Sequence, residues 1–170
     1  MNLYLFRHGI AEERGQKADF DRRLTQEGRA RTRKVAMGMK RLQLAFDVIL
    51  SSPLLRAWET AEIAAEVLEH PDPIVRCDEL ACGVDVAKLF KVLEKYRAAQ
   101  HILLVGHEPD MSEMLSYFIS GDTDAAINFK KAGWRVYSLN EGWLPNAAAE
   151  LQWLLTPGQA CALGRSQAKG

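Results

Sequence analysis

Short apolar runs alternate along the chain with longer segments in which apolar residues recur every three or four positions. The short runs predict strands over residues 2–7, 47–51, 74–76 and 101–105. The longer segments have helical spacing and predict helices over residues 26–42, 54–68, 84–96 and 110–119. Because strands and helices alternate, the pattern predicts an α/β fold, a three-layer sandwich with a mostly parallel central sheet and helices on both faces.

The pattern changes after Gly121, where regular alternation of strands and helices stops. Two strand-like runs, residues 134–139 and 149–154, flank a segment that contains the turn-forming residues Gly142 and Pro145. Two strands joined by a turn form an antiparallel pair. We therefore predict a C-terminal hairpin at the edge of the sheet.

Length and composition favour one folded unit. A chain of 170 residues with 48% hydrophobic residues can bury most of its surface around a single core. We predict one domain over residues 1–163. Residues 164–170 carry no apolar anchor, and we expect them to form a flexible tail.

Charge and cysteine content argue against several classes of protein. The 22 Lys and Arg residues balance 22 Asp and Glu residues, and no basic run indicates nucleic-acid binding. The cysteines, Cys77, Cys82 and Cys161, form no C-x-x-C pair, which argues against a disulfide framework and a zinc knuckle. No basic and apolar leader is visible, and no apolar stretch approaches the roughly 20 residues of a membrane span. We expect a cytoplasmic protein that binds neither nucleic acid nor membranes; its oligomeric state is not indicated.

The tripeptide Arg7-His8-Gly9 stands at the end of the first apolar run. An imidazole nitrogen can attack phosphorus and carry the phosphoryl group, while a planar guanidinium holds the phosphoryl oxygens. Gly9 lets the backbone approach closely. The tripeptide therefore suggests phosphoryl chemistry, although a strand can also end in these residues without any function.

Two further junctions carry similar residues. Arg56 stands in the first turn of the helix after residues 47–51, and His107 directly follows the run 101–105. Ligands of open α/β sheets bind beyond the carboxyl ends of the strands, where helix N-termini point outward. We expect Ser52 to cap the second helix and Pro109 to open the fourth. Each residue also has an interpretation without a function. Arg56 can be a surface charge of the helix, and His107 can be a helix-start residue that bonds the backbone.

Three segments together resemble the histidine phosphatase superfamily, also called the phosphoglycerate-mutase-like family. They are Arg7-His8-Gly9, Ser52-Pro53 followed by Arg56-Ala57 and Thr60, and Gly106-His107-Glu108-Pro109. Within the superfamily, the chain resembles the short phosphohistidine phosphatases of the SixA type, which are single domains. This second resemblance rests on Arg7-His8-Gly9-x-Ala11, Arg22-x-Leu24-Thr25-x-x-Gly28 and Glu79-Leu80-x-x-x-Gly83.

The resemblance implies a role for each matching residue. His8 attacks phosphorus in line, Arg7 and Arg56 clamp the oxygens, and His107 donates a hydrogen bond or a charge to the transferring group. Water then hydrolyses the phospho-His8 intermediate. Two arginines and a second histidine supply the required charge without a metal or cofactor. The remaining histidines, His70 and His101, are not spaced with carboxylates or cysteines as a metal site requires.

Two assignments stay open at this stage. A residue near Arg22 contacts the substrate in the family, but the charged segment of residues 19–23 is also typical of a solvated loop, and Arg23 is the alternative contact. Glu79 is the best match for the proton donor of the larger members, or else an ordinary exposed carboxylate. We expect Thr25 to cap the helix that follows it.

The segment around Glu79 is shorter than in the larger family members and lacks their inserted cap. An open pocket admits a side chain presented on a protein surface, and imidazole is a better leaving group than an alkoxide. The leading hypothesis is a metal-independent phosphatase that acts on phosphohistidine in a signalling protein such as an HPt domain. One alternative is a small-molecule phosphomonoesterase, and a second is a non-catalytic phosphate-binding adaptor.

Overall fold

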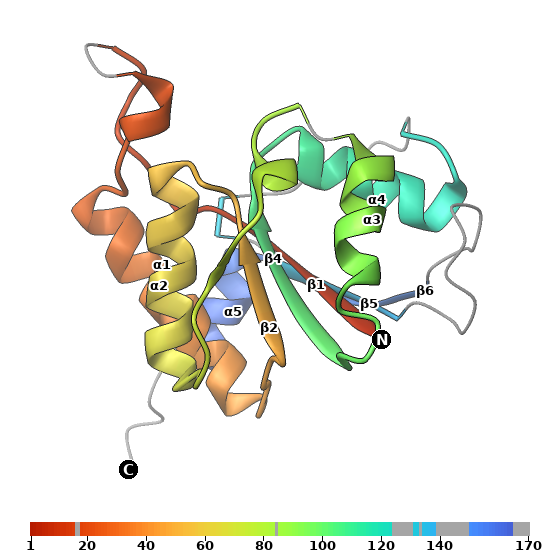
Figure 1. Cartoon of the computed structure of the whole chain (residues 1–170). Coiled ribbons are helices and arrows are strands. Elements are labelled where there is room, and N and C mark those ends of the chain that lie inside the picture. The colour runs from red at the N-terminus through yellow and green to blue at the C-terminus, as the bar shows by residue number, and fades with distance from the viewer. Residues whose placement is uncertain (16–17, 84, 124–130, 133, 139–149, 165–170) are drawn as a thin grey trace.

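In the computed structural model, the described residues are 1–15, 18–83, 85–123, 131–132, 134–138 and 150–164. They contain a central six-stranded sheet with the strand order β3-β2-β4-β1-β5-β6, with helices on both sides of it (Figure 1). The strands are β1 (Asn2–Arg7), β2 (Val48–Ser51), β3 (Val75–Arg76), β4 (His101–Gly106), β5 (Trp134–Ser138) and β6 (Glu150–Leu155). The predicted α/β sandwich is thereby confirmed.

The four strands β1 to β4 run parallel. In the centre, β1 lies beside β4 with Leu3 opposite Ile102 and Arg7 opposite Gly106. Strand β2 pairs with the other side of β4 and with β3. Because β1 and β4 are in register, both end at the same edge of the sheet, and the residues that follow them lie close together.

The C-terminal strands form the antiparallel edge that the sequence predicted. Strand β5 pairs antiparallel with β1, and β6 pairs antiparallel with β5. Residues 139–149, with Gly142 and Pro145, lie outside the described residues, so the predicted turn between the strands stays a prediction.

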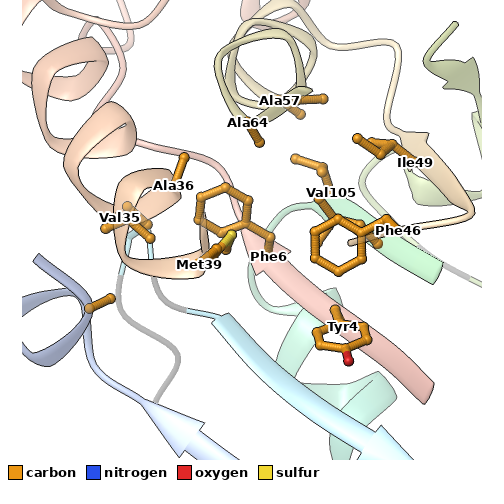
Figure 2. Close-up of a cluster of buried hydrophobic side chains, with 14 residues drawn as sticks. Tyr4, Phe6, Val35, Ala36, Met39, Phe46, Ile49, Ala57, Ala64 and Val105 are labelled. Atoms are coloured by element: carbon orange, nitrogen blue, oxygen red, sulfur yellow. The ribbon is translucent and has the colours of Figure 1, made fainter. Parts of the chain in front are cut away.

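Alternation along the central strands builds two apolar cores. Leu3, Leu5 and Leu104 face the side covered by α3 (Val86–Glu94) and α4 (Asp110–Ser120). Tyr4 and Phe6 face the opposite side, which is covered by α1 (Gln26–Arg41), α2 (Leu55–Leu68) and α5 (Pro157–Leu163). Figure 2 shows Phe6 of β1 surrounded by side chains of α1, α2 and β4. Strands buried on both faces explain the uninterrupted apolar runs in the sequence.

Helix α5 was missed by the sequence analysis. Its start carries a capping box: the Thr156 side chain accepts a hydrogen bond from the Gln159 N–H, and the Gln159 side chain bonds back to the Thr156 backbone. Gly38 of α1 permits α5 to pack closely against α1, because a Cβ at Gly38 would lie 2.4 Å from the Ala160 carbonyl oxygen of α5. Gly164, the first residue of the predicted tail, is buried against α1; residues 165–170 lie outside the described residues.

The N-cap of α1 is the one predicted from the sequence, and the N-cap of α2 is a different residue. Thr25 caps α1 by accepting the Gly28 N–H, as predicted. Ser52 does not cap α2, because the helix begins at Leu55 after the N-cap Leu54, and the Ser52 hydroxyl bonds His107 instead. Pro109 stands at the N-cap of α4. Among the described residues, no helix has both the length and the apolar character needed to cross a membrane.

Candidate active site

His8 and His107 lie side by side at the carboxyl ends of β1 and β4. The His8 N–H donates to the Gly106 carbonyl oxygen over 3.0 Å, and the centroids of the two imidazole rings are 5.1 Å apart. Only 7% of His8 and 1% of His107 is exposed. Register of the two parallel strands therefore brings together two histidines that are distant in the sequence.

Close backbone packing holds the turn after His8. The Gly9 N–H donates to the Thr60 hydroxyl over 3.1 Å, and that hydroxyl in turn donates to the Arg56 carbonyl oxygen. A Cβ at Gly9 would lie 2.5 Å from the Thr32 hydroxyl oxygen and 3.3 Å from the Gly28 carbonyl oxygen, so a larger residue there would displace its neighbours. The contact ties the turn of His8 to the first turns of α2.

One tautomer of His8 follows from its hydrogen bond. The ring Nδ1 lies 2.7 Å from the Gly9 carbonyl oxygen, and since a carbonyl only accepts, Nδ1 carries the proton. The Nε2 atom is then left with its lone pair. Burial, with the charges of His107, Arg56 and Arg7, lowers the pKa of His8 to about 3, despite the opposing effect of the Gly9 bond. At neutral pH His8 is therefore an uncharged ring with Nε2 as its basic atom.

Arg56 brings a guanidinium into the same pocket from the first turn of α2, and its side chain is only 3% exposed. Its Nη1 donates to the Asp19 carbonyl oxygen over 2.7 Å, and its Nη2 donates to the Asp19 carboxylate over 3.0 Å. The positive charge of Arg56 contributes to lowering the pKa of both His8 and His107, so its guanidinium acts on both rings.

His107 is held by Ser52 at the end of β2. The His107 Nε2 atom lies 2.8 Å from the Ser52 hydroxyl, and the His107 Nδ1 atom is buried without a hydrogen-bond partner among the described residues. Burial, followed by the charge on Arg56, lowers the pKa of His107 to about 3, although the nearby Asp19 carboxylate acts in the opposite direction.

Arg7 ends β1 and is partly buried, so that burial lowers its pKa. The negative charge of Glu108 opposes this effect, and the Glu108 carboxylate also accepts the Ser112 hydroxyl over 2.7 Å. The charge of Arg7 lowers the pKa of both histidines. Glu108 thus offsets part of the electrostatic cost of burying this arginine.

Arg22 also reaches the pocket, while its alternative, Arg23, points elsewhere. The Arg22 Nε donates to the Glu12 carbonyl oxygen and its Nη1 to the Asp19 carboxylate, both over 2.7 Å. Arg23 instead lies 3.6 Å from the buried carboxylate of Glu59. The charge of Arg22 contributes to the lowered pKa of His107, which is consistent with a position near that ring.

Glu79 lies beside the pocket rather than against the histidines. It belongs to a short 3-10 helix, η2 (Asp78–Leu80), and accepts a hydrogen bond from the Cys77 thiol over 3.5 Å. Burial, with the charge of Glu79, raises the pKa of Cys77 to about 12. Glu79 and Cys82 line a cavity of about 260 Å³, and the Cys82 sulfur lies 3.8 Å from Arg56 Nη2. In the described part of the chain, Glu79 makes no hydrogen bond to His8, Arg56 or His107, and its role as proton donor stays a prediction.

Contributions of Asp19 and Glu108 were not predicted from the sequence, although Glu108 stands in the segment Gly106-His107-Glu108-Pro109 and acts on the pKa of Arg7. Asp19 was placed in a charged, solvated segment, yet its carboxylate bonds both Arg22 and Arg56. The i,i+3 spacing of Asp19 and Arg22 was a local signal for the first of these pairs. Within the described ranges, no group of three or more His, Cys, Asp and Glu side chains is arranged to hold a metal ion.

The fold and the site define an α/β protein with a pocket at the carboxyl edge of its sheet. The pocket contains arginines and two neutral histidines. The model of the histidine phosphatase superfamily (branch 1) matches residues 3–83, which include Arg7, His8, Arg22, Arg56 and Glu79. An uncharacterized protein of Picosynechococcus sp. (strain PCC 7002) is 44% identical over 138 residues, 78% of this chain and 82% of that protein. The chain belongs to the histidine phosphatase superfamily.

Solved structures of the superfamily share the fold over nearly the whole chain. The protein histidine phosphatase SixA complexed with tungstate is similar with a TM-score of 0.82 and 24% identity, over 93% of this chain and 98% of that one. The alpha-ribazole phosphatase from Shigella flexneri is similar with a TM-score of 0.72 and 19% identity, over 92% and 97%. One fold therefore accompanies phosphatases with different substrates.

Proposed function

We propose that this protein is a phosphohistidine phosphatase that works through a covalent phospho-His8 intermediate and acts on a phosphorylated signalling protein of the cytoplasm, such as an HPt domain. Membership of the superfamily supports phosphatase activity on a phosphorylated substrate. The observation that carries the proposal is the His8 ring, whose Nδ1–H bond to Gly9 leaves the Nε2 lone pair available beside Arg7 and Arg56.

In the first step, the Nε2 lone pair of His8 attacks phosphorus. The bond between phosphorus and the substrate's imidazole nitrogen breaks, and its electron pair stays on that nitrogen; the substrate ring leaves as a neutral imidazole, with the proton on its other nitrogen. Arg7 and Arg56 offset the charge of the phosphoryl oxygens. With Ser52 donating to His107 Nε2, the ring proton of His107 resides on Nδ1, which can donate to a transferring oxygen.

In the second step, a water molecule attacks the phosphorus of phospho-His8. The bond from phosphorus to His8 Nε2 breaks, and the electron pair returns to the ring, which the Gly9 carbonyl still holds in its starting tautomer. The products are inorganic phosphate and neutral His8. The low pKa of His8 favours its departure from phosphorus as a neutral imidazole, because at neutral pH the departing ring does not take up a second proton.

Phosphohistidine is the substrate class that best suits this site. Imidazole has an unperturbed pKa of about 6.5 and leaves readily, whereas an alkoxide requires a well-placed acid. The carboxylate of Glu79 is engaged with Cys77 instead of with the histidine pair. A substrate that needs little acid catalysis is therefore favoured over a sugar phosphate.

The proposal is tested with a phosphohistidine-bearing HPt domain labelled with radioactive phosphate. Rapid quench should trap a base-stable, acid-labile phosphoryl adduct on His8, and His8→Ala should abolish both the adduct and phosphate release. His70→Ala, on the turn after α2, is the matched control and should retain activity. Rapid phosphate release without an adduct under any quench argues against the covalent route. No turnover of any phosphorylated substrate by the parent favours a phosphate-binding adaptor.

A small-molecule phosphomonoesterase is the second candidate, because Glu79 and Cys82 line a cavity of about 260 Å³ and the Cys82 sulfur lies 3.8 Å from Arg56 Nη2. Under this hypothesis Glu79 protonates an alkoxide leaving group. Glu79→Gln should then abolish hydrolysis of alkyl phosphates. If phosphohistidine is the substrate, the same variant should hydrolyse it within about threefold of the parent rate, because the leaving imidazole needs little assistance.

A further inference from the structure

Asp19 stands between two arginines of the site. It lies in a short 3-10 helix, η1 (Asp19–Asp21), beside the start of α2. One carboxylate oxygen accepts Arg22 Nη1 over 2.7 Å, and the other accepts Arg56 Nη2 over 3.0 Å. The carboxylate therefore bridges the two guanidinium groups.

Main-chain contacts fix this bridge in place. The Asp19 carbonyl oxygen accepts Arg56 Nη1 over 2.7 Å, so Arg56 grips both the backbone and the side chain of Asp19. Arg22 is anchored at its other end by the Glu12 carbonyl oxygen. A guanidinium has five N–H donors. The bonds to Asp19 and to the Cys82 sulfur use three of those of Arg56, which leaves two for another acceptor.

We propose that Asp19 is a positioning residue, which holds the guanidinium groups of Arg22 and Arg56 side by side so that their remaining donors present one preformed site for a tetrahedral oxyanion. This inference rests on the proposed function, because it assigns the oxyanion to the phosphoryl group of the substrate. Asp19 acts through the two arginines and does not itself contact the reacting atoms.

Electrostatics support a holding role. Two adjacent guanidinium groups repel each other, and a carboxylate between them offsets that repulsion while fixing both forks. The hydrogen bond from Arg22 and the charge of Arg56 lower the pKa of Asp19, so its charge persists through the neutral range. The opposite role is a competitor, in which the carboxylate occupies the oxyanion position and must leave before substrate binds.

The two roles predict opposite effects of Asp19→Asn on oxyanion affinity. If Asp19 positions the arginines, tungstate should bind the variant about tenfold more weakly in isothermal titration, because the charge-assisted bond to each of the two arginines is weakened. If Asp19 competes with the oxyanion, tungstate should bind the variant more tightly, which overturns the inference. Asp19→Glu keeps the charge and should recover part of the affinity.

Asp21→Asn is the matched control. Asp21 lies on the same short helix and is exposed, and its side chain makes no hydrogen bond or ion pair in the described part of the chain. The Asp21→Asn substitution removes the same charge from the same segment and leaves the contacts of both arginines unchanged. Tungstate affinity of this variant should stay within twofold of the parent. An equal loss in both variants indicates a general field effect and overturns the inference.

A double-mutant cycle with Arg22→Gln tests whether Asp19 acts through its partner. The effect of Asp19→Asn on tungstate affinity should shrink to less than half, on a logarithmic scale, once Arg22 is removed, whereas a merely structural role gives additive effects. Because binding is measured without turnover, the result is independent of the proposed function. A parent that binds tungstate but never hydrolyses phosphohistidine refutes the function, while Asp19→Asn still decides the inference.

Discussion

The imidazole rings of His8 and His107 lie with their centroids 5.1 Å apart, and both rings have pKa values of about 3. Two protonated rings at this distance would repel each other beside Arg7 and Arg56. Burial and the surrounding guanidinium charges keep both rings neutral, so that the His8 Nε2 lone pair is free of a proton at ordinary pH, as the proposed attack on phosphorus requires. The same arrangement has consequences for stability.

We expect acid to destabilise the protein below pH 6.5. Above that pH both imidazoles are neutral in the folded and the unfolded chain. As the pH falls toward 3, the unfolded chain binds protons that the folded rings do not, so the free energy of unfolding decreases. Each histidine contributes a slope of up to about 1.4 kcal/mol per pH unit. Urea unfolding at pH 7.5 and pH 5 measures the change.

His8→Gln provides the control for this pH dependence. The variant lacks one of the two buried imidazoles, so its stability should decrease less steeply between pH 7.5 and pH 5 than that of the parent. If the parent and the variant lose the same stability over this range, the pKa of His8 is not depressed in the folded protein, and His8 is not held neutral as the proposed attack requires.

Arg56→Lys should reduce kcat/KM about hundredfold, because an ammonium cannot span the Asp19 backbone and carboxylate and also hold a phosphoryl group. Steady-state kinetics with a chromogenic aryl phosphate measures the effect. Arg33→Lys is the matched control, since Arg33 makes a similar two-pronged contact with Glu66 on the exposed surface. Activity of Arg33→Lys should stay within twofold. Near-parental activity of Arg56→Lys contradicts a clamping role.

The fold could be predicted because strands and helices are buried differently. The central strands are buried on both faces, whereas the helices bury only part of their surface. Uninterrupted apolar runs located β1, β2 and β4, and helical spacing located four helices to within a few residues. Helix α5 was missed because it is short and because Pro157 and Gly158 are typical turn residues. Only the capping box from Thr156 to Gln159 marked it.

The site could be predicted only in part. His8 and His107 directly follow β1 and β4, and Arg56 lies in the first turn of the helix after β2, where parallel topology brings residues together. Asp19 precedes Arg56 by 37 residues, and their contact depends on how the loop after β1 folds over α2. That path is set by buried Glu59, which accepts the Leu24 N–H and pairs with Arg29. No periodicity in the sequence reports such a contact.

Gly28→Ala should destabilise the protein by about 2 kcal/mol or more, although alanine favours helices by about 1 kcal/mol. A Cβ at Gly28 would lie 2.0 Å from the Ile10 carbonyl oxygen, which is backbone and cannot swing away. The clash outweighs the helix preference and displaces the turn after His8, so activity should fall as well. Thermal and urea unfolding measure the stability.

Gly158→Ala is the control for the glycine substitution. It also adds a methyl group to a helix, but outside the adjoining residues and the helix backbone the nearest atom, the Thr156 hydroxyl oxygen, would be 3.9 Å from the new Cβ. Stability of this variant should equal or exceed that of the parent. A Gly28→Ala protein as stable as Gly158→Ala would show that the loop of Ile10 is free to move away from α1.

Ser52→Ala tests whether His107 must be held in one orientation. Loss of the hydroxyl leaves His107 Nε2 buried without its 2.8 Å partner, which costs about 1–3 kcal/mol of stability. A ring without this bond samples the wrong tautomer, so kcat should fall about tenfold or more while KM changes little.

Ser51→Ala is the control: Ser51 is equally buried, but its hydroxyl donates to the Ser52 carbonyl oxygen. Ser51→Ala should lose stability while kcat stays within threefold of the parent. Equal kcat values for the two variants would mean that His107 needs no partner at Nε2 to act.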